Sequence, residues 1–145
     1  MISLRRISHD DLDTVFQHTE MSLKDIETII ENSDSKSFHN HFFEMYVVLS
    51  ESEIVGFISL FEHSLSVVSI GPEIFEECRK RGYATKAMQK AMDIAQSNGY
   101  RIVFQQIRTD NAASIRLHKK LGFETNNMVF KNGNNNDVFL YLKSL

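Results

Sequence analysis

The sequence predicts a mixed α/β (α+β) domain, with a mostly antiparallel central sheet and helices on both of its faces. Three observations lead to this prediction. Two helical patterns follow a short N-terminal strand, three β-branched runs come next with short turns between them, and a strand–helix–strand unit follows. The chain of 145 residues, 42% hydrophobic and 24% charged, is long enough to bury one sizeable core. We therefore expect a single domain that spans residues 1–145.

The N-terminal third contains one predicted strand and two predicted helices. Residues 1–7 alternate enough between apolar and polar side chains to form a strand. A helical pattern begins at Ser8, and several aspartates near its start suit the positive end of the helix dipole. A second short helix begins after Ser22, whose hydroxyl is placed to cap the backbone at Asp25. Residues 32–40 are polar and predict a loop.

The middle of the chain predicts three consecutive antiparallel strands. Residues 46–49 and 54–60 are rich in β-branched and aromatic side chains, and a short polar turn joins them as a hairpin. Residues 65–74 form the third strand, which Gly71 and Pro72 interrupt. Because proline cannot donate to the ladder of hydrogen bonds, we expect a bulge or a sheet edge at this point.

A parallel strand–helix–strand unit and a final hairpin make up the rest of the chain. The long helix ends at Asn98 and Gly99, which are a good C-terminal signal. Asp110 or Asn111 caps the helix that follows. The predicted ranges are 81–97 for the long helix, 101–107 for the strand after it, about 112–121 for the second helix, and 129–130 with 138–142 for the hairpin.

A basic segment with a glycine lies between the third strand and the long helix. Arg79, Lys80 and Arg81 bring positive charge to the point where the helix begins, and the free N–H groups of a helix start attract phosphate. Gly82 has no side chain to keep a ligand away from the backbone. The segment is neither a Walker loop nor a dinucleotide-binding glycine motif. Two interpretations fit these residues alone: a pyrophosphate site, or an ordinary helix start with a solvated basic turn.

Two motifs together indicate a family. Residues 79–84, Arg-Lys-Arg-Gly-Tyr-Ala, resemble the signature [RQ]-x-x-G-x-[GA] of the GNAT superfamily of N-acetyltransferases, which binds the pyrophosphate of acetyl-CoA. Residues 111–123 resemble its second signature, N-x-x-[AS]-x-x-L-[YH]-x-K-x-G-F, with one predicted helix and one strand between the two motifs. The resemblance covers residues 47–123. Residues 82–85, Gly-Tyr-Ala-Thr, are similar to the branch that includes the ribosomal-protein N-terminal acetyltransferases.

The resemblance implies a GNAT-like fold and a site for acetyl-CoA. GNAT folds splay the two parallel strands apart and hold the arm of acetyl-CoA in the cleft between them. Backbone groups of Ile74 and Phe75 would pair with the pantetheine amides, and the N–H groups of residues 81–85 would hold the pyrophosphate. The acetyl-CoA-binding residues implied by the resemblance are Ile74, Phe75, Arg79, Lys80, Arg81, Gly82, Tyr83, Ala84, Thr85, Asn111 and Ser114.

The activity implied by the resemblance is direct transfer of an acetyl group from acetyl-CoA to a primary amine in a ternary complex. The amine would belong to a protein N-terminus, a lysine or a small molecule. His118 takes the position at which many family members have a tyrosine that protonates the leaving thiolate. Histidine can also act as a general acid. A core histidine bound to backbone groups and a simple contact to CoA are the alternatives, and its helix face predicts that the ring points inward.

The general base has several candidates. Glu73 lies at the end of the central strand, near the expected thioester, and is the first of them. Glu62 and His63 lie in the preceding turn and could line the amine side, and a water chain to a distant carboxylate would also serve. Cys78 is not expected to be a nucleophile because no base accompanies it.

The acceptor is expected to bind at the two early helices, residues 39–43 and the tip of the final hairpin. Acidic side chains on the early helices favour a cationic amine, or they form plain solvated faces. His39 and His41 would lie on one side of a strand, but a metal site there lacks a third ligand. Two alternatives to an enzyme are a non-catalytic acyl-CoA-binding regulatory module of the same fold, and an interaction domain without a CoA site.

Composition restricts the expected partners and compartment. A net charge of −3 does not suit a nucleic-acid binder, and no apolar run approaches the ~20 residues of a membrane span. The single cysteine, Cys78, excludes an internal disulfide and leaves no metal-ligand spacing. With no signal-peptide pattern at its start, the chain is expected to be cytoplasmic. Its expected partners are acetyl-CoA as co-substrate and an amine acceptor, and it would act as a monomer or homodimer.

Overall fold

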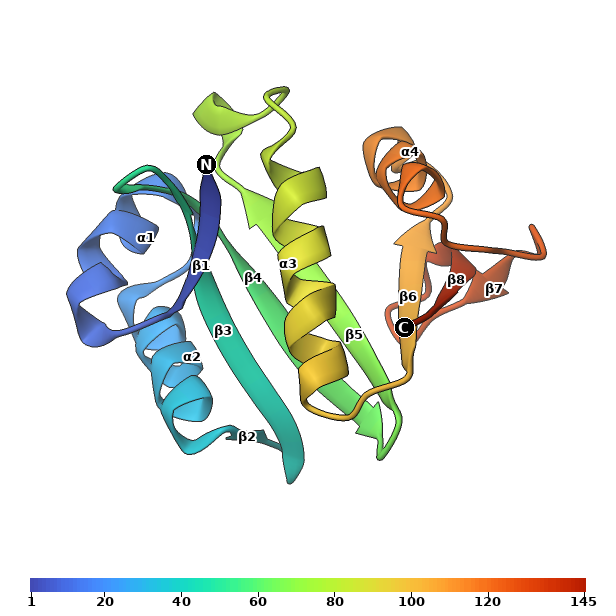
Figure 1. The fold of residues 1–145 in the computed structure, drawn as a ribbon, viewed down its shortest axis with the longest axis horizontal. Helices are drawn as coiled ribbons and strands as arrows, with labels where there is room; N and C mark the ends of the chain where they lie inside the picture. Colours follow the sequence, from blue (N-terminus) through green and yellow to red (C-terminus); the bar gives the residue numbers. More distant parts are fainter.

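The computed structural model describes residues 1–145, which form an eight-stranded sheet with helices packed against it (Figure 1). The strands follow one another in the order β1-β3-β4-β5-β6-β8-β7, and β2 pairs with β3 outside this path. The helices are α1 (Leu12–His18), α2 (Leu23–Ser35), α3 (Tyr83–Ser97) and α4 (Ala112–Lys120), with short 3-10 turns at His9–Asp11 and Glu76–Cys78. The strands are β1 (Ile2–Arg6), β2 (Ser37–Phe38), β3 (His41–Ser50), β4 (Glu53–Ser64), β5 (Val67–Ile74), β6 (Ile102–Arg108), β7 (Phe130–Lys131) and β8 (Asp137–Ser144).

The strands β5 and β6 form the one parallel pair in an otherwise antiparallel sheet. Their backbones pair only at Val67 with Ile102 and at Val68 with Val103. Beyond these residues the two strands diverge toward their C-terminal ends, as Figure 1 shows. Because α3 connects them, β5, α3 and β6 are the predicted parallel unit. The prediction of a mixed, mostly antiparallel sheet with a splayed parallel pair is confirmed.

The helices cover opposite faces of the sheet because a strand directs alternate side chains to opposite sides. In β3, Tyr46 and Val48 belong to the larger core, which also contains the buried face of α3. Met45 and Val47 belong to a second core with apolar side chains of α1 and α2. None of the four helices is both long enough and apolar enough to cross a membrane.

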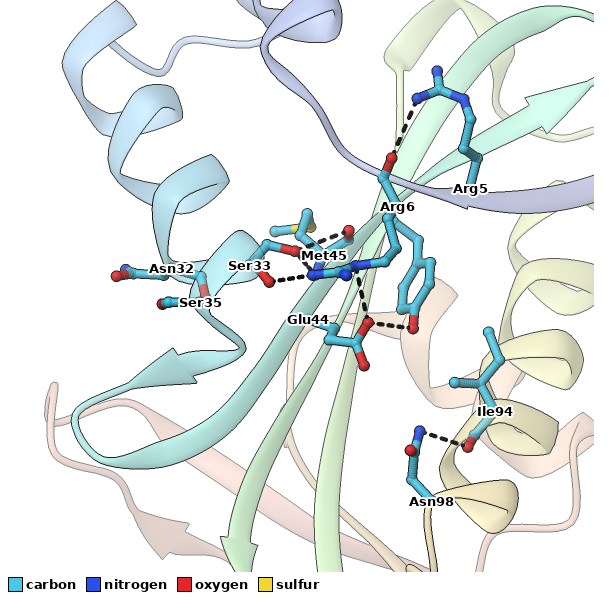
Figure 2. Close-up of polar contacts among 10 residues, drawn as sticks. Arg5, Arg6, Asn32, Ser33, Ser35, Glu44, Met45, Ile94 and Asn98 are labelled. Atoms are coloured by element: carbon cyan, nitrogen blue, oxygen red, sulfur yellow. Dashed lines mark hydrogen bonds and ion pairs between the residues drawn. The ribbon is translucent and has the colours of Figure 1, made fainter.

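Polar contacts connect α2 to β3 around the buried residues Ser33 and Glu44. We refer to Arg6, Ser33, Glu44, Met45 and Tyr46 as the α2–β3 polar cluster (Figure 2). The Ser33 hydroxyl, which is fully buried, accepts a hydrogen bond from the Met45 N–H at 2.9 Å. Arg6 donates to the Ser33 carbonyl and pairs with the Glu44 carboxylate at 3.2 Å. The Tyr46 hydroxyl donates to Glu44 at 2.8 Å, and burial, together with this contact, raises the pKa of Tyr46.

Two helix boundaries differ from the predicted ones. α2 continues to Ser35, so residues 32–35 are helical rather than part of a loop. It ends there because Lys36 adopts a left-handed conformation with φ 55°. α3 begins at Tyr83, two residues later than predicted, because Gly82 also leaves the helical region, with φ 77°.

One prediction about the strands is wrong, and one that left two alternatives open is resolved. His39 has φ 50° and lies in the turn between β2 and β3, so it does not share a strand face with His41. Of the bulge or sheet edge predicted at Gly71 and Pro72, the structure has the edge, because the register shift between β4 and β5 lies near Glu62 instead. Pairing with β4 continues through both of these residues, and only the side of β5 that faces β6 is unpaired there.

Candidate active site

The predicted phosphate loop joins β5 to α3. Gly82 is the N-cap of α3, and no side chain caps this end of the helix. The N–H groups of Tyr83, Ala84 and Thr85 therefore lack the acceptors that the interior of a helix supplies. A Cβ atom placed on Gly82 would meet no heavy atom within 4 Å, so the space beside the helix start is open. The arrangement is suited to an anion.

The three basic residues of the loop take different roles. Arg79 folds back on β5, where its Nε donates to the Ile74 carbonyl at 2.9 Å and its Nη2 contacts the Glu73 carboxylate at 3.2 Å. Lys80 and Arg81 are exposed and form no ion pair. Two of the three predicted cations are thus free to attract an anion, and Arg79 instead holds the end of the strand.

Tyr83 and Ala84 face the protein rather than the open space beside the helix start. The Ser50 hydroxyl donates to the Tyr83 hydroxyl at 3.3 Å, and this contact lowers the pKa of Tyr83. Ala84 packs against the core with the ring of Tyr83. These two residues therefore offer a ligand their backbone N–H groups and not their side chains.

A cleft of about 420 Å³ lies where β5 and β6 separate, and we refer to it as the β5–β6 cleft. The residues that line it include Ile70, Gly71 and Pro72 of β5, Gln105 and Ile107 of β6, and Ser114 and His118 of α4. This space between the strands is the one in which the resemblance places the acyl-CoA arm.

The open edge of β5 presents few backbone donors to this cleft. The Ile70 N–H bonds to the side chain of Gln105, so it points away from β4. Because backbone direction alternates along a strand, the N–H of Ile74 faces the same way, whereas Pro72 has none. The N–H of Phe75 donates to Val55 at 2.9 Å and its carbonyl accepts from Cys78 at 2.8 Å, so both are already used. Of the two residues predicted to bind the pantetheine amides, Ile74 and Phe75, only Ile74 offers a free N–H.

His118 is almost completely buried, with 2% of its surface exposed, and it points inward as predicted. Its Nδ1 lies 2.8 Å from the Ser114 carbonyl, which only accepts, so Nδ1 carries the proton. Its Nε2 lies 3.1 Å from the Nε2 of Gln105, which only donates, so the ring nitrogen accepts. Burial lowers the pKa of His118 and outweighs the Ser114 carbonyl, which raises it. The ring is neutral, with both nitrogens engaged.

Asn111 caps α4 rather than extending into the cleft. Its side-chain oxygen accepts a hydrogen bond from the Ser114 N–H at 3.1 Å, so of the two caps that the sequence allowed, Asp110 and Asn111, the cap is Asn111. The amide nitrogen of Asn111 makes no hydrogen bond within the chain, so it is free for a ligand. The cap and a ligand contact are therefore compatible.

A second cleft, of about 650 Å³, lies between the α1–α2 connection and the C-terminal end of β5. Four carboxylates line it, and we refer to it as the acidic cleft: Glu20, Asp25, Glu73 and Glu76. Phe57 and Phe75 supply apolar surface, and the ring of His18 stacks on Phe75 with centroids 4.6 Å apart. The Glu73 carboxylate, about half exposed, thus lies beside the end of β5, as expected.

The other candidate bases lie elsewhere. Glu62 pairs opposite Val68, near the other end of β5 from Glu73, and it accepts a hydrogen bond from Tyr100 at 2.6 Å. His63 contacts the Ser69 hydroxyl at 2.6 Å, and burial lowers its pKa. Neither residue lines the acidic cleft.

Sequence reasoning missed several residues of these two clefts. His18, Phe57 and Glu76 come together with Glu73 only in the folded chain, and no local motif marks them. The sequence likewise predicted Gln105 only as part of a strand and gave it no role in the site. No group of three potential metal ligands is present.

Comparisons with known proteins agree with this geometry. The chain matches the model of the acetyltransferase (GNAT) family over residues 2–123, and no curated protein sequence matches it. Its fold is similar to that of spermidine N-acetyltransferase from Vibrio cholerae, solved with CoA and spermine, at a TM-score of 0.81 and 16% identity over 99% of this chain and 95% of that one. It is also similar to an acetyltransferase from Salmonella typhimurium that modifies the N-terminal serine of ribosomal protein L7/L12 (TM-score 0.84, 18% identity, 99% and 95% covered).

A third similar structure is a putative acetyltransferase from Salmonella typhimurium with acetyl-CoA (TM-score 0.79, 17% identity, 100% and 94% covered). At these identities the structures establish the shared fold, and the family model establishes the relationship. The splayed strands, the uncapped helix start and the match over residues 2–123 lead to one conclusion: the chain belongs to the acetyltransferase (GNAT) family.

Proposed function

We propose that the protein transfers an acetyl group from acetyl-CoA directly to a primary amine. The observation that carries this proposal is the uncapped start of α3 beside the β5–β6 cleft, which can receive an anion and an extended arm at the same time. Two of the similar structures hold CoA or acetyl-CoA according to their descriptions, which supports this choice of donor.

In this proposal, the backbone binds most of the donor. The N–H groups of Tyr83, Ala84 and Thr85 bind the pyrophosphate, and the Thr85 hydroxyl can add a further bond. Lys80 and Arg81 attract the phosphates through their charge. The pantetheine arm then follows the open edge of β5.

The walls of the cleft would guide the pantetheine arm. The Ile74 N–H can donate to one of its amide carbonyls, and the side chains of Asn111 and Ser114 lie on the α4 side. Phe75 shapes the site with its buried ring, because its backbone groups are already bonded within the chain.

The acidic cleft supports an acceptor that carries more than one positive charge. Four carboxylates face one guanidinium, that of Arg79, and one histidine, His18, so the cleft attracts cations. One of the similar enzymes is described as a complex with spermine, a polyamine. We therefore propose a cationic amine, such as a polyamine or a basic peptide terminus, as the acceptor.

In this mechanism, the acceptor ammonium loses a proton before it attacks the thioester carbon. Glu73 is the proposed base, because it is the carboxylate at the end of β5 and lines the acidic cleft. The nitrogen–carbon bond then forms, the carbon–sulfur bond breaks, and the thiolate of CoA takes up a proton. The prediction that His118 supplies this proton stays a prediction, and in the resting structure the Nδ1 proton points at Ser114.

Binding and turnover together test this proposal. Acetyl-CoA should raise the melting temperature of the protein, because a ligand that binds only the folded state stabilises it. Acetyl transfer should then be measured for spermine, for a basic peptide with a free N-terminus, and for a primary amine whose ammonium group is its only charge. We expect the two acceptors with several positive charges to have the lower KM values. An unchanged melting temperature with acetyl-CoA would contradict the donor assignment, and equal KM values would contradict the role of the acidic cleft.

A glutamate-to-glutamine pair of variants tests the base. Glu73→Gln should lower kcat by about 10²-fold or more, the lower end of the range for general acid–base groups. Glu53→Gln is the matched control, since Glu53 is exposed at the start of β4 and lines neither cleft. If both variants keep the parent kcat, the base is another group or a water chain.

A further inference from the structure

The side chain of Gln105 takes the place of a paired strand at the point where β5 and β6 separate. Its Oε1 accepts from the Ile70 N–H at 3.0 Å, and its Nε2 donates to the Ile70 carbonyl at 2.6 Å. These are the two hydrogen bonds that a neighbouring backbone would make. Gln105 and Ile70 are both buried, so neither backbone group of Ile70 can turn to water instead.

The remaining hydrogen of the same carboxamide points at α4. The Nε2 of Gln105 lies 3.1 Å from the Nε2 of His118, and the other ring nitrogen donates to Ser114. The amide uses both of its N–H groups and its oxygen in these contacts. Rotating the amide by half a turn would place N–H groups against the Ile70 N–H, so the contacts permit only one orientation.

We propose that Gln105 is a positioning residue that holds β5 and α4, the two walls of the β5–β6 cleft, at a fixed separation. This inference rests on the proposed binding of acetyl-CoA in that cleft. One wall carries the Ile74 N–H and the other carries Asn111 and Ser114. Gln105 bonds to the first wall through Ile70 and to the second through His118, where the backbones no longer pair.

A neutral amide suits this place better than the obvious substitutes. A leucine would leave the buried N–H and carbonyl of Ile70 without partners. A glutamate would place a charge in a buried site and would remove both donors. The carboxamide alone supplies an acceptor and two donors without charge, and its second donor meets the His118 Nε2, which carries no proton.

Gln105→Met tests this role because methionine keeps the length and flexibility of the chain but forms no such hydrogen bonds. His118 still packs on the rings of Phe123 and Tyr141, at centroid distances of 4.8 and 6.1 Å, so we expect the variant to fold. The matched control is Gln96→Met, at an exposed position of α3.

Three measurements should be made on each variant: the KM and calorimetric Kd for acetyl-CoA, kcat, and the ring ¹⁵N shifts of His118. For Gln105→Met we expect KM and Kd to rise about tenfold, with kcat within about threefold of the parent, because the donor site is loosened and the chemistry is not. The ¹⁵N shift of His118 Nε2 should change because that nitrogen loses its hydrogen-bond donor, while Nδ1 keeps its proton on the Ser114 carbonyl. Gln96→Met should match the parent in all three measurements.

Gln105→Glu is the second variant, and it serves if the methionine variant does not fold. Its carboxylate can still accept from Ile70 and would turn His118 Nε2 into a donor, which the ¹⁵N shifts would show. Unchanged Kd and unchanged His118 ring ¹⁵N shifts in a folded variant, with only a lower melting temperature, would overturn the inference. If the parent protein fails to bind acetyl-CoA, the proposed function fails, but the His118 spectrum still decides whether Gln105 holds the ring.

Discussion

The α2–β3 polar cluster and the Gln105–His118 pair both bury polar groups to join a helix to the sheet, but they do so with different chemistry. The first uses ions, with Arg6 paired to Glu44, and it lies away from both clefts. The second is neutral and borders the β5–β6 cleft. Only the Glu44 end of this ion pair is buried, because the Arg6 side chain is 41% exposed, so the guanidinium compensates the buried carboxylate without losing its own contact with water.

This contrast indicates where charge is acceptable in this fold. A buried ion beside the β5–β6 cleft would compete with the groups that bind the donor, whereas an amide and a neutral imidazole would not. The comparison therefore predicts that changes near the cleft alter donor binding and that changes in the α2–β3 polar cluster alter stability. The four experiments below separate these two effects.

The largest expected effect is that of Gly82→Glu. A carboxylate at the start of α3 would repel the pyrophosphate and should weaken acetyl-CoA binding by about 100-fold or more, as an unfavourable charge contact does at close range. The glutamate backbone also has to adopt φ 77°, a conformation that costs a residue with a Cβ atom about 1–2 kcal/mol of stability. Gly82→Asn is the control, because asparagine tolerates this conformation without adding charge. Isothermal calorimetry measures the Kd, and a glutamate variant that binds like the asparagine variant would remove this loop as the phosphate site.

The next effect belongs to the α2–β3 polar cluster. Ser33→Ala removes the acceptor of the buried Met45 N–H, which should cost about 1–3 kcal/mol of unfolding free energy. The melting temperature should fall by roughly 2–4 °C for each kcal/mol lost. Ser35→Ala is matched to it, since Ser35 lies on the same helix but is exposed. Both variants should keep the parent kcat/KM below the melting transition. A loss of kcat/KM confined to Ser33→Ala would show that the cluster also shapes the active site.

A smaller effect is expected for His118→Phe, on which the two interpretations of this residue disagree. A general acid would lose about 10²-fold or more in kcat. A core histidine would lose stability instead, because one N–H of Gln105 loses its acceptor. Both ring nitrogens are already bonded, so we expect kcat within about threefold and a stability loss of about 1–2 kcal/mol. Turnover, calorimetry and a melting curve distinguish the two, and restoration of a lost kcat by His118→Tyr would establish the acid role.

The smallest effects are those of pH on stability, and they lie in opposite directions for the two regions. The folded-state pKa of His118 is below its ordinary value of 6.5, so the unfolded chain binds more protons there and stability falls as the pH drops below about 6.5. The folded-state pKa of Tyr46 is above its ordinary value of 10.0, so the protonated hydroxyl stabilises the fold. This stabilisation is lost as the pH rises beyond 10.

Denaturation at several pH values checks both regions with one substitution each. His118→Phe should reduce the loss at low pH, and Tyr46→Phe should reduce the loss at high pH. His118→Phe should leave the loss of stability at high pH unchanged, and Tyr46→Phe should leave the loss at low pH unchanged. His63 and Tyr100 titrate in the same directions and remain in both variants, so each comparison with the parent isolates one residue.

Local signals in the sequence predicted most of the fold because they act over a few residues. Ser22 and Asn111 cap the helices that follow them, at 3.1 Å from the N–H groups of Asp25 and Ser114. The boundaries that were wrong depend on backbone conformations rather than on caps. Lys36 adopts a positive φ where α2 ends, and Gly82 does so just before α3 begins. A lysine in a sequence does not predict a positive φ.

Residues of the candidate site could be predicted only where they belong to one continuous sequence motif. The predicted phosphate loop is continuous in sequence, so one motif covers all of its residues. Gln105 bonds to Ile70, 35 residues earlier in the chain, and no spacing rule connects a strand glutamine to a distant backbone. The acidic cleft likewise assembles side chains from the α1–α2 connection and from the end of β5. The sequence also could not predict that the backbone of Phe75 has no free group for a ligand. Its N–H and carbonyl bond to Val55 and Cys78, and these contacts exist only in the folded chain.

The open edge of β5 has a consequence for how an extended ligand is aligned along the strand. A bare strand edge offers an N–H at every second residue, so a ligand can slide by two residues and find equivalent partners. Here the N–H of Ile70 is occupied by Gln105, and Pro72 has none, so Ile74 alone is left. Such an edge permits a single alignment and excludes the shifted ones. For the proposed acetyl-CoA complex, we therefore expect the protein, and not the flexibility of the ligand, to set the distance from the predicted phosphate loop to the reacting carbon.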